Sequence, residues 1–132
     1  MTEQTTTKEQ LYDLLQLTYF NGIDGANADQ AVQALHENIQ WVHTQVWEHD
    51  DHDRSTTDTL VGRETVREFL ARRIEQMQVV GIKHKVGTVI TDGQHGAFRA
   101  EVVGPTGKSV PFFGWVELEG GKISSYMVMP QR

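Results

Sequence analysis

Two side chains in this sequence, His43 and Tyr19, are of the types that move a proton next to a carbonyl group. An imidazole has an ordinary pKa of about 6.5, so His43 can take up and return a proton near neutral pH. The hydroxyl of Tyr19 can donate a hydrogen bond to the oxyanion that develops when a carbonyl compound enolises. Each has a structural alternative: a strand histidine hydrogen-bonded to helix backbone, and a core tyrosine whose hydroxyl reaches water.

The segment from Glu48 to Thr59 contains no apolar residue and includes the polar cluster His49–Asp53. Histidine and carboxylate side chains are ligands that zinc and other transition metals prefer. Consecutive polar residues in a loop are more often simply solvated, so we expect no metal site and no other cofactor. Because this loop adjoins the strand that carries His43, it is also placed to act as a lid over a pocket.

The composition describes one small domain. The chain has 132 residues, a net charge of -6 and no cysteine. This length fits a single core, and the absence of cysteine excludes disulfides and thiol catalysis. The acidic balance argues against nucleic-acid binding. No apolar stretch approaches the ~20 residues of a membrane helix, and the polar start shows no signal peptide. We therefore expect a cytoplasmic protein with neither nucleic acid nor membrane as partner.

The domain spans residues 1–132 and should begin with a disordered segment at residues 1–6. Its first half predicts two helices before a polar loop at 48–59 and a third helix after it, with a hairpin within 45–61 as the alternative to the loop. Thr7 and Gln10 form a capping box before a helix that should end between Phe20 and Asp24. Asn27 can cap a second, shorter helix. The third helix, Glu64–Gln76, has a clear apolar stripe. Three of its arginines lie off that stripe and should face water: Arg67, Arg72 and Arg73.

The second half of the chain predicts a sheet, because the apolar pattern changes to period two after Gly81. Short connectors rich in Gly, Pro and Asp join antiparallel neighbours. We expect an antiparallel meander with the strand Ile39–His43 added at one edge. Helices on a curved, mostly antiparallel sheet make an α+β domain shaped as a cone-like barrel. The four strands of the meander should be Lys83–Thr91, Gly96–Val103, Val110–Glu119 and Lys122–Met129.

A cone of this kind encloses an apolar hollow, which is the usual site for a small molecule. The strand Val110–Leu118 is apolar on both faces, so the sequence does not decide which of its faces lines the hollow. Its other face, with Phe113 and Trp115, should be covered by a second subunit in a homodimer. The expected lining comprises Trp41, Phe98, Ala100, Val102, Phe112, Gly114, Val116, Tyr126 and Val128.

Several phrases, in this order, resemble the ketosteroid-isomerase and SnoaL-like branch of the nuclear transport factor 2 superfamily. They are YFNGIDGANAD at Tyr19–Asp29, ENIQWVHT at Glu37–Thr44, GRETVREF at Gly62–Phe69, FRAEVV at Phe98–Val103 and GGKISSY at Gly120–Tyr126. The resemblance implies the cone fold. It does not fix one activity, because the family includes isomerases, cyclases, dehydratases, epoxide hydrolases and non-catalytic binders.

The resemblance also implies roles for individual residues. His43 stands where ketosteroid isomerases have their aspartate base, and Tyr19 matches their oxyanion-donating tyrosine. Their second donor, an aspartic acid, is replaced by Gly114. Limonene epoxide hydrolases offer an Arg-x-Asp pattern that resembles Arg99-x-Glu101, but their remaining carboxylate would fall near Val128.

We therefore expect a cofactor-independent isomerase, cyclase or dehydratase that acts on a small apolar carbonyl compound. His43 would remove a proton in one ionisation near neutral pH, and Tyr19, assisted by Tyr126, would hydrogen-bond the enolate oxygen. The alternative is a non-catalytic module of the same fold that binds a ligand or a partner. Gly114 favours this alternative, and His43 favours the enzyme.

Overall fold

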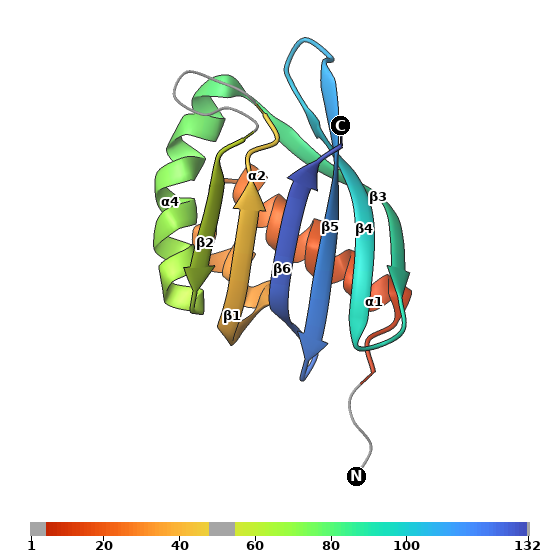
Figure 1. Cartoon of the computed structure of the whole chain (residues 1–132). Coiled ribbons are helices and arrows are strands. Elements are labelled where there is room, and N and C mark those ends of the chain that lie inside the picture. The colour runs from red at the N-terminus through yellow and green to blue at the C-terminus, as the bar shows by residue number, and fades with distance from the viewer. Residues whose placement is uncertain (1–4, 48–54, 132) are drawn as a thin grey trace.

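The computed structural model describes residues 5–47 and 55–131, which form an α+β domain. Figure 1 shows the first helical run, which spans residues 8–24, crossing one face of a curved sheet. The helix α4 lies alongside the strand β2. Within the described ranges, none of the helices is both long and apolar enough to cross a membrane. The six-stranded sheet is curved but not closed, since β2 and β3 form its two edges. The predicted α+β class and mostly antiparallel sheet are confirmed.

The helices begin and end largely where local signals place them. Thr7 and Gln10 form both hydrogen bonds of the predicted capping box, and the side chain of Asn27 accepts from the backbone of Gln30. Gly81 ends α4 in the left-handed conformation with φ 82°, which glycine adopts without strain. The bounds are α1 Lys8–Tyr12, η1 Asp13–Phe20, α2 Asn21–Asp24, α3 Ala28–Ala31, η2 Val32–Ala34 and α4 Arg63–Val80.

The sheet has the order β2-β1-β6-β5-β4-β3, so the predicted meander is present as β3 to β6. β1 pairs in parallel with β6, and the other neighbours are antiparallel. β1 is therefore added at one edge of the meander, next to β6, as predicted, and β2 adds a further strand on its other side. The bounds are β1 Leu35–Thr44, β2 Thr57–Val61, β3 Lys83–Thr91, β4 His95–Val103, β5 Ser109–Glu119 and β6 Lys122–Pro130.

Two ordered segments depart from the sequence-based prediction. Strand β2 begins at Thr57, inside the segment expected to be a polar loop, because backbone pairing with β1 stabilises a strand that has few apolar residues. Thr6, expected to be disordered, is buried, and its N–H donates to the carbonyl of Gly93 at 3.0 Å. Residues 1–4, and residues 48–54 with the polar cluster His49–Asp53, lie outside the described residues.

One core fills the space between the helices and the concave face of the sheet. Leu11 and Leu15 contribute from the first helical run, and Val66, Leu70 and Ile74 contribute the predicted stripe of α4. The sheet contributes alternate residues of each strand, as its period-two pattern requires. This packing leaves a pocket between η1, α4 and the strands β1, β3 and β6.

Candidate functional site

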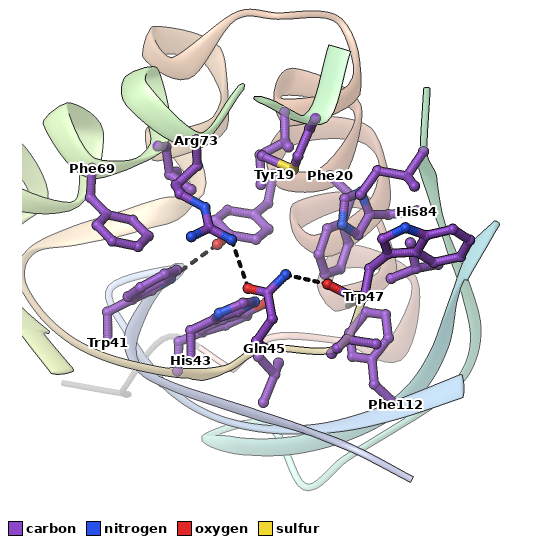
Figure 2. A pocket seen from close by; sticks show the side chains of 18 residues that line it. Tyr19, Phe20, Trp41, His43, Gln45, Trp47, Phe69, Arg73, His84 and Phe112 are labelled. Carbon is purple, nitrogen blue, oxygen red and sulfur yellow. Dashed lines mark hydrogen bonds between the residues drawn. The ribbon is translucent and has the colours of Figure 1, made fainter. Parts of the chain in front are cut away.

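The pocket is small and mostly apolar, with a free volume of about 60 Å³. Pockets for drug-sized ligands span about 300–1,000 Å³, so this one fits a much smaller molecule unless side chains move. Figure 2 shows polar groups from several elements converging in it. The lining consists of Tyr19, Phe20, Ile23, Trp41, His43, Gln45, Val46, Trp47, Phe69, Leu70, Arg73, Met77, Ile82, His84, Val102, Phe112, Tyr126 and Val128.

Tyr19 is held at one wall of the pocket by hydrogen bonds to its oxygen. The indole Nε1 of Trp41 donates to this oxygen at 3.0 Å, and the hydroxyl of Tyr126 is a second hydrogen-bond partner. Burial raises the pKa of Tyr19 above its ordinary value, and both hydrogen bonds offset part of that effect. The hydroxyl of Tyr19 therefore stands in the pocket as part of a hydrogen-bonded group with Trp41 and Tyr126.

The helical run that carries Tyr19 changes from α to π geometry over residues 13–20. The backbone N–H of Asn21 donates to the carbonyl of Gln16, five residues earlier, as a π-helix requires. Wider turns change which side chains share a face, so Gln16 and Asn21 also hydrogen-bond through their side chains at 2.9 Å. π segments are rare and occur frequently at functional sites.

His43 lies on β1 with its ring stacked on Trp41, the ring centroids 5.3 Å apart. Burial lowers the pKa of His43 to about 3, and the positive charge of Arg73 adds to this effect. In residues 5–47 and 55–131, the ring nitrogens of His43 have no hydrogen-bond partner. The imidazole is therefore neutral at physiological pH and can hydrogen-bond a ligand, but the expected ionisation near neutrality is displaced to acidic pH.

A second histidine, His84 on β3, lines the pocket and is hydrogen-bonded to a carboxylate. Its Nδ1 lies 2.6 Å from Oδ1 of Asp24, and its backbone N–H donates to Oδ2 at 2.7 Å. The ring also stacks on Phe20, with centroids 5.0 Å apart and planes 11° from parallel. A carboxylate that accepts from Nδ1–H fixes the tautomer, leaving the lone pair on Nε2. This arrangement is that of an oriented general base.

Arg73 enters the pocket from α4, although its position off the apolar stripe predicted that it would face water. Figure 2 shows its guanidinium directed at Gln45, to which it donates a hydrogen bond of 2.7 Å. Gln45 in turn donates to the carbonyl of Trp47 at 2.6 Å. Burial lowers the pKa of Arg73, and the nearby Asp58 acts in the opposite direction. The long side chain bridges from α4 to the segment after β1.

Seven of the predicted site residues line this pocket: Tyr19, Trp41, His43, Val102, Phe112, Tyr126 and Val128. Four others, Phe98, Ala100, Gly114 and Val116, do not line it and are buried in the core. The reason is the ring of Phe98, whose atoms approach within 2.2 Å of the place where a Cβ of residue 114 would lie. The ring occupies the space that any side chain at residue 114 would need.

Sequence reasoning missed Asp24, His84 and Arg73. The DG dipeptide at Asp24 indicated only a turn, and His84 was one polar position in an alternating strand. A signal that could have found them is a histidine on an edge strand together with an aspartate at a helix end, but their pairing spans 60 residues. In the described part of the chain, no group of three His, Asp or Glu side chains is arranged to hold a metal ion.

Comparisons with known proteins agree with this architecture. The sequence model of the SnoaL-like domain matches residues 17–126. No curated protein matches the chain. Among solved structures, a candidate ketosteroid isomerase from Kribbella flavida is 16% identical with a TM-score of 0.66, over 96% of this chain and 82% of that one.

Two further structures of this kind are similar. A ketosteroid isomerase-like protein from Catenulispora acidiphila, solved in complex with trimethylamine, is 18% identical with a TM-score of 0.66, over 93% of this chain and 85% of that one. An NTF2-like protein of unknown function from Cytophaga hutchinsonii is 20% identical with a TM-score of 0.59, over 99% of this chain and 95% of that one. These likenesses show the fold, and the family match covers most of the chain. The chain therefore belongs to the SnoaL-like domain family.

Proposed function

We propose that this protein binds a small, largely apolar carbonyl compound and catalyses proton transfer on it, as an isomerase, cyclase or dehydratase. The observation that carries the proposal is His84, held by Asp24 at 2.6 Å, in the same pocket as the hydroxyl of Tyr19. An oriented base and an oxyanion donor are the two groups that enolisation requires. The apolar walls supply the remaining contacts and exclude water.

In this proposal His84 removes the proton next to the carbonyl. Its Nε2 takes the proton, the electrons of the broken C–H bond form the C=C bond of the enolate, and the π electrons of the carbonyl move to its oxygen. Tyr19 hydrogen-bonds that oxygen. Asp24 stabilises the imidazolium that forms, as a carboxylate on Nδ1 does in other acid–base pairs. The imidazolium then returns its proton to another carbon in an isomerisation, or to a leaving hydroxyl in a dehydration.

His43 is the base that the sequence predicted, and we give that role to His84 instead. A base is most effective when its pKa is near the working pH, whereas burial and Arg73 lower the pKa of His43 to about 3. A neutral imidazole stacked on Trp41 is better suited to orienting the ligand by a hydrogen bond. Arg73, beside it in the pocket, adds a positive charge that favours an oxyanion.

The experiment screens small enolisable ketones for proton–deuterium exchange by NMR, with the wild type and three variants. His84→Gln should slow exchange by about 10²–10⁴-fold, the usual loss for a general base. Asp24→Asn should also slow it strongly, while His43→Gln should have the smallest effect. If His43→Gln abolishes exchange and His84→Gln does not, the base is His43. Equal exchange by the wild type and both histidine variants would overturn the proposal.

A non-catalytic binding module is the second candidate, and Gly114 is the observation that favours it. The space of a second oxyanion donor is filled by Phe98, and the pocket holds only about 60 Å³ of free volume. The trimethylamine complex of the similar protein from Catenulispora acidiphila supports a ligand of small size. Ketones that bind, as seen by ligand-observed NMR, but never exchange a proton would favour the module over the enzyme.

We also propose that two copies associate through the convex face of the sheet. On this face Phe113 stands opposite Met129, and Trp115 stands opposite Met127. These four side chains are between 43% and 50% exposed. The row through Trp115 and Met127 continues across the neighbouring strands to Ile90 and Val42. A contiguous apolar surface of this kind is typical of an interface, and a twofold axis would cover it with itself.

A further inference from the structure

The outer edge of β3 is closed by side chains of the first helical run and not by another strand. β3 is the last strand of the sheet, so alternate backbone groups on one side have no neighbouring strand. Asp24 accepts from the N–H of His84, and Nε2 of Gln16 donates to the carbonyl of the same residue at 3.1 Å. Oε1 of Gln16 accepts from the N–H of Val86 at 2.6 Å. One carboxamide thus replaces the pairing that a strand would supply.

Gln16 is buried, and every polar group of its side chain is used. Its second amide N–H donates to Oδ1 of Asn21 at 2.9 Å, a contact between residues five apart that the π-helix makes. In an α-helix, residues three and four apart are neighbours instead. The π segment therefore aims Gln16 at β3 while Tyr19, on the same segment, reaches the pocket.

β3 needs this support at the position of His84. The pairing of β3 with β4 is irregular between Val86 and Thr88, two residues further along the strand. A bulge leaves one residue of the strand unpaired and disrupts the ladder of hydrogen bonds locally. A shift of the His84 backbone would separate Nδ1 from Asp24, because both hydrogen bonds to that carboxylate depend on one short segment of β3.

We infer that Gln16 is a positioning residue for His84: its carboxamide fixes the β3 backbone on both sides of residue 85 and so keeps the imidazole on Asp24. This inference rests on the proposed function for its catalytic consequence, but not for its structural part. Gln16 neither touches the proposed ligand site nor takes part in the chemistry. A role limited to protecting the sheet edge would leave the tautomer of His84 and the turnover number unchanged.

The test compares Gln16→Met, which keeps the length but removes the hydrogen bonds, with Gln16→Glu, which keeps an acceptor for Val86 but lacks the amide N–H. Thr7→Ala is the control, because it removes a helix cap far from His84. The readouts are the imidazole ¹⁵N signals of His84, the melting temperature, and kcat and KM for ketone proton exchange.

In Gln16→Met we expect the ¹⁵N signals to change from one tautomer to an average of both. We expect kcat to fall about 10- to 100-fold with KM nearly unchanged, because misplaced catalytic groups lose rate more than binding. Gln16→Glu should show a smaller change in the same direction. Thr7→Ala should lower the melting temperature without moving the signals of His84. Wild-type tautomer signals in a folded Gln16→Met protein would overturn the inference.

Hydrogen exchange of the wild type tests the same contact without any substitution. The backbone N–H groups of His84 and Val86 should be protected although they face the edge of the sheet. Rapid exchange of Val86 would overturn the inference even if both variants failed to fold. Failure of the proposed function has a different signature: His84→Gln would then exchange ketone protons at the wild-type rate, while Gln16→Met would still change the tautomer of His84.

Discussion

The indole Nε1 of Trp41 donates a hydrogen bond of 3.0 Å to the hydroxyl oxygen of Tyr19, and both side chains are about 1% exposed. The bond joins the first helical run to β1 at the wall of the pocket. It makes Tyr19 a structural residue as well as a candidate oxyanion donor, because removal of its hydroxyl leaves a buried N–H without an acceptor.

Tyr19→Phe should therefore affect both activity and stability. We expect ketone exchange to slow by about 10²–10³-fold through loss of the oxyanion donor. The free energy of unfolding should fall by about 1–3 kcal/mol, because Trp41 loses its buried acceptor. Urea denaturation measures the second effect. Tyr12→Phe, on the exposed side of the same helical run, is the matched control and should change neither quantity.

His43 should make the protein sensitive to acid. Burial lowers the pKa of His43 in the folded state to about 3, whereas in the unfolded state its ordinary value is about 6.5. Between these values only the unfolded chain binds the proton, so stability is lost as pH falls through this window. The contribution is at most about 1.4 kcal/mol per pH unit. Urea denaturation from pH 4 to 7 should show a shallower loss for His43→Gln than for the wild type. Parallel curves would contradict the burial of His43.

Arg73→Gln should raise the pKa of His43. The guanidinium adds to the effect of burial by repelling the imidazolium, so its removal brings the pKa part of the way back to the ordinary value. An NMR titration of the His43 ring measures the change. Arg72→Gln, on the neighbouring position of α4, is the control. An unchanged titration in Arg73→Gln would contradict this contribution of Arg73.

Gly114→Ala should destabilise the fold, because the new Cβ would meet the ring of Phe98 at 2.2 Å. Overpacking of this kind typically costs about 1–3 kcal/mol. Phe98→Leu in the same chain should relieve the clash, so the two costs should not add. Gly87→Ala is the control, since its Cβ would meet only a carbonyl oxygen at 3.4 Å. Additive costs in the double variant would contradict the close contact.

Trp115→Glu should convert the proposed homodimer into a monomer. The charge would lie in the apolar row on the convex face, where a second copy would have to desolvate it. Light scattering at micromolar concentration measures the change in mass. Val79→Glu is the control, because Val79 is 89% exposed on α4, an element separate from that face. A wild-type protein with a monomeric mass would contradict the proposed homodimer.

Local patterns determined most of the elements. The capping box at Thr7 and Gln10, the cap at Asn27 and the change to period two after Gly81 depend on residues close in sequence, and each predicted its element. The sequence did not decide between a loop and a hairpin for the segment that contains β2, because an edge strand with little apolar surface forms through backbone pairing with β1, which no local pattern records.

The composition of the pocket was decided by tertiary structure. The resemblance placed Tyr19 and His43 in the site and supplied their roles, but it did not predict that the ring of Phe98 occupies the space beside Gly114. Asp24 and His84 meet across 60 residues because a helical run packs against the edge of β3. Local sequence thus determined which elements form and which face of each is apolar. Only the packing of those elements decided which polar side chains share a buried space, because such contacts depend on residues far apart in the chain.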